Sequence, residues 1–429
     1  MFHAEDKEIR RLLFEGRFGL EKECLRVNPD GTFAHSLHPF PDDENLVYDF
    51  CENQTEINTE VAGSAKEALD LLQHYTERIQ KKLAALSSPE LLWPFSNPPY
   101  IRNERDIPIA RHNVKAEYNE GYREYLADRY GRYKMALCGI HVNFSFAEEL
   151  LKADFALSDH TDFHEYKNEQ YLSLAEGLAA DGWIITALTA ASPLLDGSYF
   201  EKGKEGTTVF NGMSSTRCSE LGYWNYFTPV FDYSNIRAYA KSIQRYVEED
   251  YIASPTELYY PIRLKSYGKN NLKRLHDEGV SHIELRMVDL NPLAPSGMDL
   301  RDLQFIHLLL IWIMCQPRRN LKPCDQIQAA QNFKNAAHYD LKTVKIVAPH
   351  SVSQSGSGSS VADEGLKILR LMKEFFRDFP HPVPDILDFE ERKLLDPETR
   401  YSWMIRKELE TNYVEKGLQL AKTLQKEMI

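Results

Sequence analysis

The sequence predicts an α+β fold in which helices cover one face of a largely antiparallel sheet. Short strand-like runs lie between segments with helical spacing of apolar residues, without the regular strand–helix rhythm of a parallel sheet. Three of these runs carry polar side chains at positions i and i+2, which a strand directs to the same face. We therefore expect one face of the sheet to be apolar and covered by helices, and the other to be polar and to line a cavity.

The three strand-like runs occupy residues 18–27, 141–146 and 282–287. In the first run Glu21 and Glu23 share a face, and in the third run Glu284 shares a face with Arg286. The second run places His141 opposite its aliphatic and aromatic residues, on the same face as Asn143 and Ser145. The polar face of the sheet thus gathers carboxylates, an imidazole and a guanidinium.

Helices are expected at about 64–87, 172–192, 235–249 and 300–315, where apolar residues recur at helical spacing. A serine- and glycine-rich stretch at about 350–361 predicts a flexible loop, and the part at about 362–429 is expected to be helical. The sequence contains no internal repeat and no strong inter-domain linker. Residues 1–429 are therefore predicted to form a single domain.

The composition is that of an ordinary globular protein, with 43% hydrophobic residues, 27% charged residues and a net charge of −13. The negative charge argues against a nucleic-acid or anionic-membrane partner, because phosphate groups bind to basic surfaces. Six scattered cysteines without metal-site or disulfide spacing indicate reduced thiols. No signal peptide is visible, and the most apolar run, Leu308–Cys315, is far shorter than the roughly 20 residues of a membrane span. A cytoplasmic protein is expected.

The paired glutamates predict a metal site. Two carboxylates on one strand face repel each other, and burial raises their pKa unless a cation compensates. Mg²⁺ prefers such oxygen ligands. Further candidate ligands are Asp49, Glu56, His141 and Glu284. This much negative charge suits two or three Mg²⁺ ions that also bridge the phosphates of a nucleotide, and Arg286 would stabilise charge on a transferring phosphoryl group.

Each part of this interpretation has an ordinary structural alternative. A strand with alternating glutamates is more often a solvated face than a metal site, and a single histidine is more often structural. Asp49 and Glu56 are seven residues apart, a spacing that defines no common strand face. Arg286 could also form a plain salt bridge with Glu284.

Seven segments in one order resemble the bacterial glutamate–cysteine ligases, also called γ-glutamylcysteine synthetases. They span about 280 residues: FGLEKECLRV (18–27), YDFCENQTE (48–56), LWPFS (92–96), GIHVNFS (139–145), RCSELGY (217–223), YYPIR (259–263) and IELRMVDLNP (283–292). The last third of the chain resembles this family only in its helical character.

The resemblance implies a glutamine-synthetase-like fold, with a curved antiparallel sheet that forms a funnel-shaped active site. It implies Mg²⁺ ligation, with Mn²⁺ as a possible substitute, by Glu21, Glu23, Asp49, Glu56, His141 and Glu284. It implies that Arg286 contacts the transferred phosphoryl group, that Arg123 and Arg263 contact phosphate or substrate, and that Arg217 holds a substrate carboxylate. The acceptor pocket would be walled by Phe50, Tyr122, Leu126, Met135, Tyr223 and Tyr259.

The implied reaction has two steps and uses ATP as co-substrate. The γ-carboxylate of glutamate attacks the γ-phosphate of ATP, and the amine of cysteine then displaces phosphate from γ-glutamyl phosphate. This chemistry needs charge neutralisation and alignment more than a covalent enzyme group. The expected partners are thus small molecules that feed glutathione-type thiol synthesis. The sequence indicates nothing about the oligomeric state.

The sequence departs from the family pattern beside His141. Met135 and Ala136 stand where relatives usually carry Gln followed by Thr or Ser, and Val142 replaces a usual Tyr. The ordinary explanation of these changes is drift in a packed strand. The functional alternative is a sister ligase that joins glutamate, or a similar acid, to another amine. A non-catalytic sensor would lack a ligand or Arg286, and here all are present. The length of the chain leaves no room for an ATP-grasp module, so glutathione synthesis itself is not expected.

Overall fold

Alternating apolar and polar residues form the central sheet, as the sequence predicts. The computed structural model describes residues 1–111, 120–201, 204–268, 271–348, 358–380 and 382–428. The strands of the sheet are β1 (Gly16–Val27), β2 (Leu46–Tyr48), β3 (Gln54–Asn58), β4 (Leu91–Leu92), β5 (Ile140–Phe146), β8 (Ile262–Lys265) and β9 (His282–Val288). Within the described residues these seven strands follow the order β2-β3-β1-β5-β9-β8, with β4 paired to β1. Every pairing among them is antiparallel.

The register of the sheet brings distant residues opposite one another. Glu21 of β1 pairs with His141 of β5, and Glu23 pairs with Glu56 of β3. Glu284 lies on β9, the strand that follows β5 in the sheet. The pairing of β5 with β9 shifts by one residue beside His141. Such irregularities re-aim side chains and are common next to active sites.

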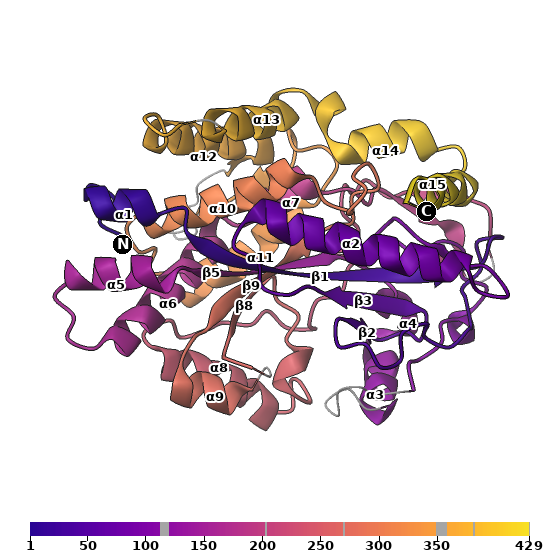
Figure 1. Ribbon diagram of the computed structural model, residues 1–429, viewed down its shortest axis with the longest axis horizontal. Helices are drawn as coiled ribbons and strands as arrows, with labels where there is room; N and C mark the ends of the chain where they lie inside the picture. Colours follow the sequence, from indigo (N-terminus) through magenta and orange to yellow (C-terminus); the bar gives the residue numbers. More distant parts are fainter. Residues whose placement is uncertain (112–119, 202–203, 269–270, 349–357, 381, 429) are drawn as a thin grey trace.

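Helices cover the apolar face of the sheet in two layers (Figure 1). The helices are α1 (Lys7–Leu12), α2 (Ala65–Ala84), α3 (Glu120–Tyr130), α4 (Arg132–Met135), α5 (Glu148–Ala156), α6 (Phe163–Asp181), α7 (Trp183–Thr189), α8 (Ile236–Glu248), α9 (Leu272–Glu278), α10 (Leu300–Met314), α11 (Pro323–Ala336), α12 (Val361–Phe375), α13 (Val383–Leu395), α14 (Tyr401–Leu409) and α15 (Tyr413–Met428). In Figure 1, α2 and α10 lie above the sheet and α12 to α15 form a layer above them, whereas α3, α8 and α9 lie below it.

The hydrophobic core lies between the sheet and the helices directly above it, α2 and α10. Ser64 caps α2 by accepting a hydrogen bond from the backbone N–H of Glu67, and the apolar stripe of α2 packs on β1. On α10 the His307 ring packs against Phe18 and Phe144 of the sheet, with ring centroids 5.1 and 5.0 Å away. Because the apolar side chains of the strands face these helices, their polar neighbours face the other side.

The expected helices are found, with one difference. The helix expected at 172–192 begins earlier, at Phe163, because Asp162 caps it with hydrogen bonds to backbone N–H groups of the first turn. Its first turns are too polar to show apolar periodicity. The helix ends at Asp181, and α7 follows after Gly182.

Among the described residues, two small sheets and the C-terminal region remain. Strands β6 (Leu194–Asp196) and β7 (Thr208–Phe210) form one pair, and β10 (Lys345–Ile346) and β11 (Ser359–Ser360) form another. Most of the loop expected at 350–361 falls at residues 349–357, outside the described residues. The region from residue 362 onward is largely helical, as expected, and among the described residues no helix has the length and apolar character to cross a membrane.

A buried charge cluster joins the two helical layers. The Lys393 ammonium of α13 lies 2.6 Å from a carboxylate oxygen of Asp302 on α10 and 2.8 Å from one of Glu390. The Tyr401 hydroxyl of α14 donates a further hydrogen bond to Asp302 at 3.1 Å. All four residues are buried. The docking of α13 and α14 on α10 therefore depends on charges that water does not reach.

Candidate active site

A cavity of about 590 Å³ opens on the polar face of the sheet. Its walls come from β1, β2, β3, β5, β8 and β9 and from α3. The predicted site residues that line it are Glu21, Glu23, Asp49, Phe50, Glu56, Tyr122, Arg123, Leu126, Met135, His141, Tyr223, Tyr259, Arg263, Glu284 and Arg286. Arg217 instead lines a small adjoining pocket, together with Tyr223, Tyr259 and Arg286. The fold thus brings nearly the whole predicted set to one cavity.

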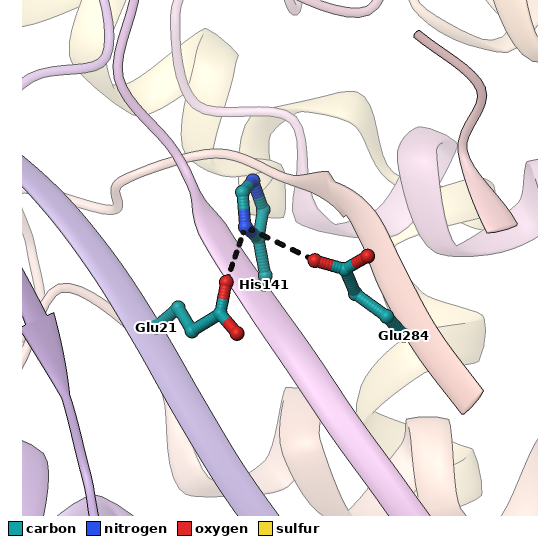
Figure 2. A group of neighbouring side chains, drawn as sticks. All are labelled: Glu21, His141 and Glu284. Carbon is teal, nitrogen blue, oxygen red and sulfur yellow. Dashed lines mark hydrogen bonds and ion pairs between the residues drawn. The ribbon is translucent and has the colours of Figure 1, made fainter. Parts of the chain in front are cut away.

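Three of these residues meet at the centre of the sheet. Glu21, His141 and Glu284 come from β1, β5 and β9 and point toward one another (Figure 2). His141 Nδ1 lies 3.0 Å from Glu21 Oε2 and 3.7 Å from Glu284 Oε1. One potential ligand atom from each residue lies within 4.8 Å of the other two. Asn143 also donates a hydrogen bond to Glu21 Oε1 at 3.0 Å.

The remaining acidic residues surround this group without joining it. Glu23 Oε2 accepts a hydrogen bond from the backbone N–H of Gly139 at 3.0 Å, and Glu23 Oε1 lies 3.5 Å from His141 Nε2. Asp49 and Glu56 line the same cavity. In the described part of the chain, only Glu21, His141 and Glu284 are close enough to share one ion as placed.

Burial makes the ionisation of these groups unequal. Burial, reinforced by the Asp49 carboxylate, raises the pKa of Glu23 to about 8. Burial also raises the pKa of Asp49. It would do the same to Glu21, but the hydrogen bond with His141 lowers the pKa of Glu21 to about 2. Burial and the nearby Arg286 lower the pKa of His141 to about 4, so its imidazole is neutral at pH 7.

This arrangement fits a hard divalent cation. Carboxylate oxygens and a neutral imidazole nitrogen are ligands that such ions accept. Crowded buried carboxyls take up protons unless positive charge compensates them, as the raised pKa of Glu23 indicates. The donor set and its electrostatics therefore agree with the metal-site prediction.

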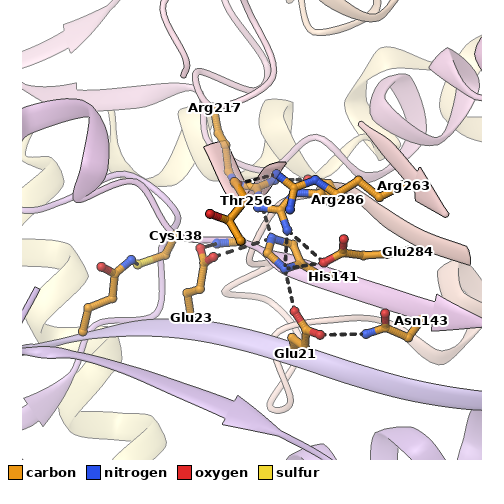
Figure 3. A network of polar contacts seen from close by, with 12 residues as sticks. Glu21, Glu23, Cys138, His141, Asn143, Arg217, Thr256, Arg263, Glu284 and Arg286 are labelled. Atoms are coloured by element: carbon orange, nitrogen blue, oxygen red, sulfur yellow. Dashed lines mark hydrogen bonds and ion pairs between the residues drawn. The ribbon is translucent and has the colours of Figure 1, made fainter. Parts of the chain in front are cut away.

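Two guanidinium groups contact the central group of Glu21, His141 and Glu284. Arg286 Nη1 donates a hydrogen bond to Glu284 Oε1 at 2.8 Å and lies 3.4 Å from His141 Nδ1 (Figure 3). Arg217 Nη1 donates to the carbonyl oxygen of Arg286 at 2.5 Å, and its Nη2 lies 3.1 Å from His141 Nε2. Arg286 thus lines the cavity beside Glu284, whereas Arg217 contacts His141 from outside the cavity lining.

Arg123 and Arg263 line the cavity but also hold its walls. Arg123 donates to the carbonyl oxygens of Asp49 and Ala110 at 2.9 and 3.0 Å. Arg263 donates from Nε to the carbonyl oxygen of Leu258 at 3.0 Å, and from Nη2 to that of Thr256 at 2.9 Å. Part of each guanidinium is therefore engaged with the backbone.

The wall beyond Arg286 is aromatic and apolar. The rings of Tyr223 and Tyr259 meet edge to face, with centroids 5.0 Å apart. Phe50, Leu126 and Met135 line the same cavity and are buried. Such a surface suits a small apolar side chain with few polar contacts.

Several cavity residues were absent from the predicted set. They are Arg17, Asn143, Ser145, Lys265 and His282, among others. The alternation along the strands already placed Asn143 and Ser145 on the polar face, and it could have identified Arg17, Lys265 and His282 in the same way. Lys265 lies two residues after Arg263, and His282 lies two residues before Glu284.

Replacing Gly139 with alanine is expected to lower the free energy of unfolding by about 1–3 kcal/mol. The new Cβ would lie 2.3 Å from Cζ of Arg217, so the guanidinium would leave its hydrogen bonds to His141 and to the Arg286 carbonyl. Urea unfolding measures the effect. Gly19→Ala is the control, because its Cβ would come no closer than 3.6 Å to Asn143. Equal stability of the two variants would contradict the prediction.

Comparison with known proteins identifies similar sequences. The family model described as glutamate-cysteine ligase matches residues 2–253 and 227–336. The glutathione biosynthesis bifunctional protein GshAB of Listeria monocytogenes is 35% identical over an alignment 442 residues long. This alignment covers 99% of this chain and 56% of that protein. The protein of the same name from Clostridium perfringens is 32% identical over 441 residues, covering 97% and 55%. The chain thus spans just over half the length of these curated relatives.

Solved structures share the fold. The crystal structure of a bifunctional glutathione synthetase from Pasteurella multocida has a TM-score of 0.83 at 24% identity, over 99% of this chain and 54% of that one. A glutamate–cysteine ligase from Francisella tularensis in complex with AMP has a TM-score of 0.85 at 22% identity, over 97% and 89%. The expected α+β fold on an antiparallel sheet is confirmed, and it is the fold of these two structures.

Proposed function

Because this chain belongs to the glutamate–cysteine ligase family, we propose that it joins the γ-carboxylate of glutamate to the amine of cysteine at the expense of ATP. One observation carries the proposal. Carboxylates from neighbouring strands surround His141 and Arg286 in a cavity large enough for small substrates. Such a site is built to neutralise and align negatively charged reactants.

The proposed products are γ-glutamylcysteine, ADP and phosphate. In the first step an oxygen of the γ-carboxylate bonds to the γ-phosphorus of ATP while the bond from that phosphorus to the ADP oxygen breaks. In the second step the amine nitrogen bonds to the acyl carbon, phosphate leaves, and the amine loses a proton. Arg286 would stabilise charge on the phosphoryl group during transfer, with Arg123 and Arg263 as further contacts to phosphate or substrate.

We propose two or three Mg²⁺ ions as cofactors, with Mn²⁺ as a possible substitute. The proposed ligands are Glu21, Glu23, Asp49, Glu56, His141 and Glu284. When bound, the ions would supply the positive charge that lets a carboxylate approach a triphosphate. The crowding of buried carboxyls in the cavity supports this proposal.

The acceptor is proposed to occupy the aromatic wall beyond Arg286. Phe50, Tyr122, Leu126, Met135, Tyr223 and Tyr259 would surround its side chain. Arg217 would reach the acceptor's carboxylate through the small pocket that it shares with Tyr223 and Tyr259. Because this wall is apolar, a thiol or another small side chain would fit it better than a charged one.

We further propose that residues 1–429 act as one catalytic domain, since one continuous cluster of buried residues joins the sheet to the C-terminal helices. Six free cysteines support a reducing, cytoplasmic location. The proposed partners are the small-molecule substrates, without nucleic acid or membrane.

The function is tested by offering the protein Mg-ATP, glutamate and a panel of amino acids. We expect ADP release that depends on both glutamate and cysteine, and mass spectrometry should detect γ-glutamylcysteine. If only another amine gives a product, the acceptor is different but the chemistry stands. If no acid and amine pair releases ADP, the ligase proposal fails.

A further inference from the structure

Arg217 reaches the centre of the site from a segment outside the seven-stranded sheet. This segment, residues 213–223, lies between β7 and α8. Figure 3 shows the Arg217 side chain beside His141 and Arg286, which belong to β5 and β9. The guanidinium contacts His141 Nε2 and the carbonyl oxygen of Arg286. Because both partners lie on the sheet and the Arg217 backbone does not, these contacts persist only while the segment keeps its position.

Asp289 connects this segment to the end of β9. The Ser215 hydroxyl donates a hydrogen bond to Asp289 Oδ1 at 2.9 Å. The same hydroxyl oxygen accepts a hydrogen bond from the backbone N–H of Cys218 at 3.2 Å. Arg217 lies between Ser215 and Cys218 in the chain. The Ser215 hydroxyl therefore closes the turn around Arg217 and joins that turn to the carboxylate.

The other oxygen of Asp289 acts on the same turn through a second contact. Asp289 Oδ2 accepts hydrogen bonds from the backbone N–H of Ala191 at 2.9 Å and from the Ser192 hydroxyl at 2.7 Å. The Ser192 hydroxyl oxygen in turn accepts from the backbone N–H of Thr216 at 3.2 Å. Thr216 directly precedes Arg217. Both oxygens of the carboxylate thus hold the backbone next to the arginine through one serine each.

The hydrogen bonds around Asp289 fit a charged carboxylate. The hydroxyls of Ser192 and Ser215 each accept from a backbone N–H, so each directs its own proton to Asp289. With the N–H of Ala191, three donors face the carboxyl, which is 1% exposed. Burial raises the pKa of Asp289, whereas these hydrogen bonds and the Arg217 guanidinium act in the opposite direction. Charge-assisted hydrogen bonds are about twice as strong as neutral ones, so a carboxylate holds the turn better than an amide.

One strand therefore places both arginines of the centre. Arg286 lies on β9 and lines the cavity, and Asp289 directly follows the end of this strand at Val288. The position of Arg217 relative to Arg286 is set by the carbonyl contact between them and by Asp289 acting on the turn. A substrate that meets both guanidinium groups needs this relative position to be constant.

We infer that Asp289 is a positioning residue for the acceptor amino acid: through Ser215 and Ser192 it holds the turn from which Arg217 extends, and so places the guanidinium that receives the acceptor's carboxylate. This inference rests on the proposed function, in which Arg217 holds that carboxylate. Asp289 itself lies outside the cavity lining and touches no substrate.

The test is steady-state ADP release by the wild type, Asp289→Asn and Ser215→Ala, with glutamate and the acceptor amino acid that the wild type uses, L-cysteine in the proposed function. Asp289→Asn places an NH₂ group where an acceptor is needed, and Ser215→Ala removes the connection to the turn. We expect each variant to raise the KM for the acceptor about 10-fold, because a charge-assisted hydrogen bond is lost. The turnover number and the KM for ATP should stay within about threefold, since Glu284 and Arg286 remain in place.

The double variant Asp289→Asn, Ser215→Ala separates one connection from two independent effects. Both substitutions break the same connection, so the double variant should raise the acceptor KM no more than about twofold beyond Asp289→Asn. A rise equal to the product of the two single rises would overturn the inference. Unchanged acceptor KM in both single variants would also overturn it, as would a loss of turnover at unchanged KM.

Asp196→Asn is the matched control. Asp196 is also 1% exposed and accepts three hydrogen bonds, from the N–H and the hydroxyl of Ser198 and from the N–H of Gly206, within the β6–β7 hairpin. It should lose stability in urea as Asp289→Asn does, but its acceptor KM should stay within about twofold of the wild type. An equal rise of the acceptor KM in both variants would show a general loss of structure and overturn the inference. If the wild type releases no ADP with any acid and amine pair, the proposed function fails as well.

Discussion

Replacing Glu21 with glutamine is expected to lower the turnover number at least about 100-fold while the chain remains folded. Glu21 provides one of the three side chains that meet at the centre of the cavity. The amide has nearly the same shape but carries no charge, so the site would hold divalent cations more weakly. ADP release measured across a Mg²⁺ titration checks this prediction.

The hydrogen bonds of Glu21 give a second reason to expect a lower turnover number. Its Oε1 accepts from Asn143, and its Oε2 lies 3.0 Å from His141 Nδ1. A glutamine can offer an oxygen to only one of these neighbours, and its NH₂ group must face the other. The carboxamide therefore disturbs the orientation of the imidazole as well as the charge.

Glu15→Gln is the control, since Glu15 lies just before β1 and is exposed. It should keep full turnover. Glu21→Asp separates the effect of the charge from that of the imidazole orientation, because it keeps the charge and shortens the side chain. We expect partial activity that recovers at higher Mg²⁺ concentration. Full activity of Glu21→Gln at low Mg²⁺ would remove Glu21 from the proposed metal site.

Replacing Lys393 with methionine is expected to lower the free energy of unfolding by about 3–5 kcal/mol. The ammonium is the cation beside the buried carboxyls of Asp302 and Glu390, and it also donates to the carbonyl oxygen of Leu188. Burial already raises the pKa of Glu390 well above its usual value, in spite of Lys393. Without the ammonium, both carboxyls would have to be protonated or remain uncompensated. Urea unfolding followed by circular dichroism measures the change.

The loss of unfolding free energy in Lys393→Met should depend on pH. In the variant, a buried carboxyl without a cation has a raised pKa in the folded state, so its protonation favours folding at low pH. That contribution disappears as the pH rises, and the difference between wild type and variant should be larger at pH 8 than at pH 5. A difference that shrinks with rising pH would contradict this account.

Lys407→Met is the matched control for Lys393→Met. Lys407 pairs with Glu398 at 3.0 Å in the same C-terminal layer, but both side chains are exposed. Its replacement should cost less than about 1 kcal/mol. The combined variant Lys393→Met, Asp302→Leu, Glu390→Leu should recover part of the stability, because it leaves no buried charge. If Lys393→Met lowered the free energy of unfolding as little as the control does, the buried charge cluster would contribute little to stability.

Local sequence pattern was sufficient for the elements that carry the site. Alternation along the strands placed Glu21 and Glu23 on one face, and Glu284 with Arg286 on another strand, because a strand has a side-chain period of two. The same rule would have identified Lys265 and His282. It could not relate Asp49 and Glu56 to the others, since their spacing defines no common face. The start of α6 was missed because its first turns are polar and only the cap at Asp162 marks it.

What the sequence alone determined is the chemistry available to the protein: which side chains are carboxylates, guanidinium groups or aromatic rings, and which strand face each occupies. The tertiary structure alone decided which of them meet. Antiparallel register places Glu21 beside His141, and the neighbouring strand adds Glu284, whereas Arg217 lies behind the cavity wall. The physical reason is that strand pairing and helix docking join residues far apart in the chain, and no local periodicity records the register of that pairing.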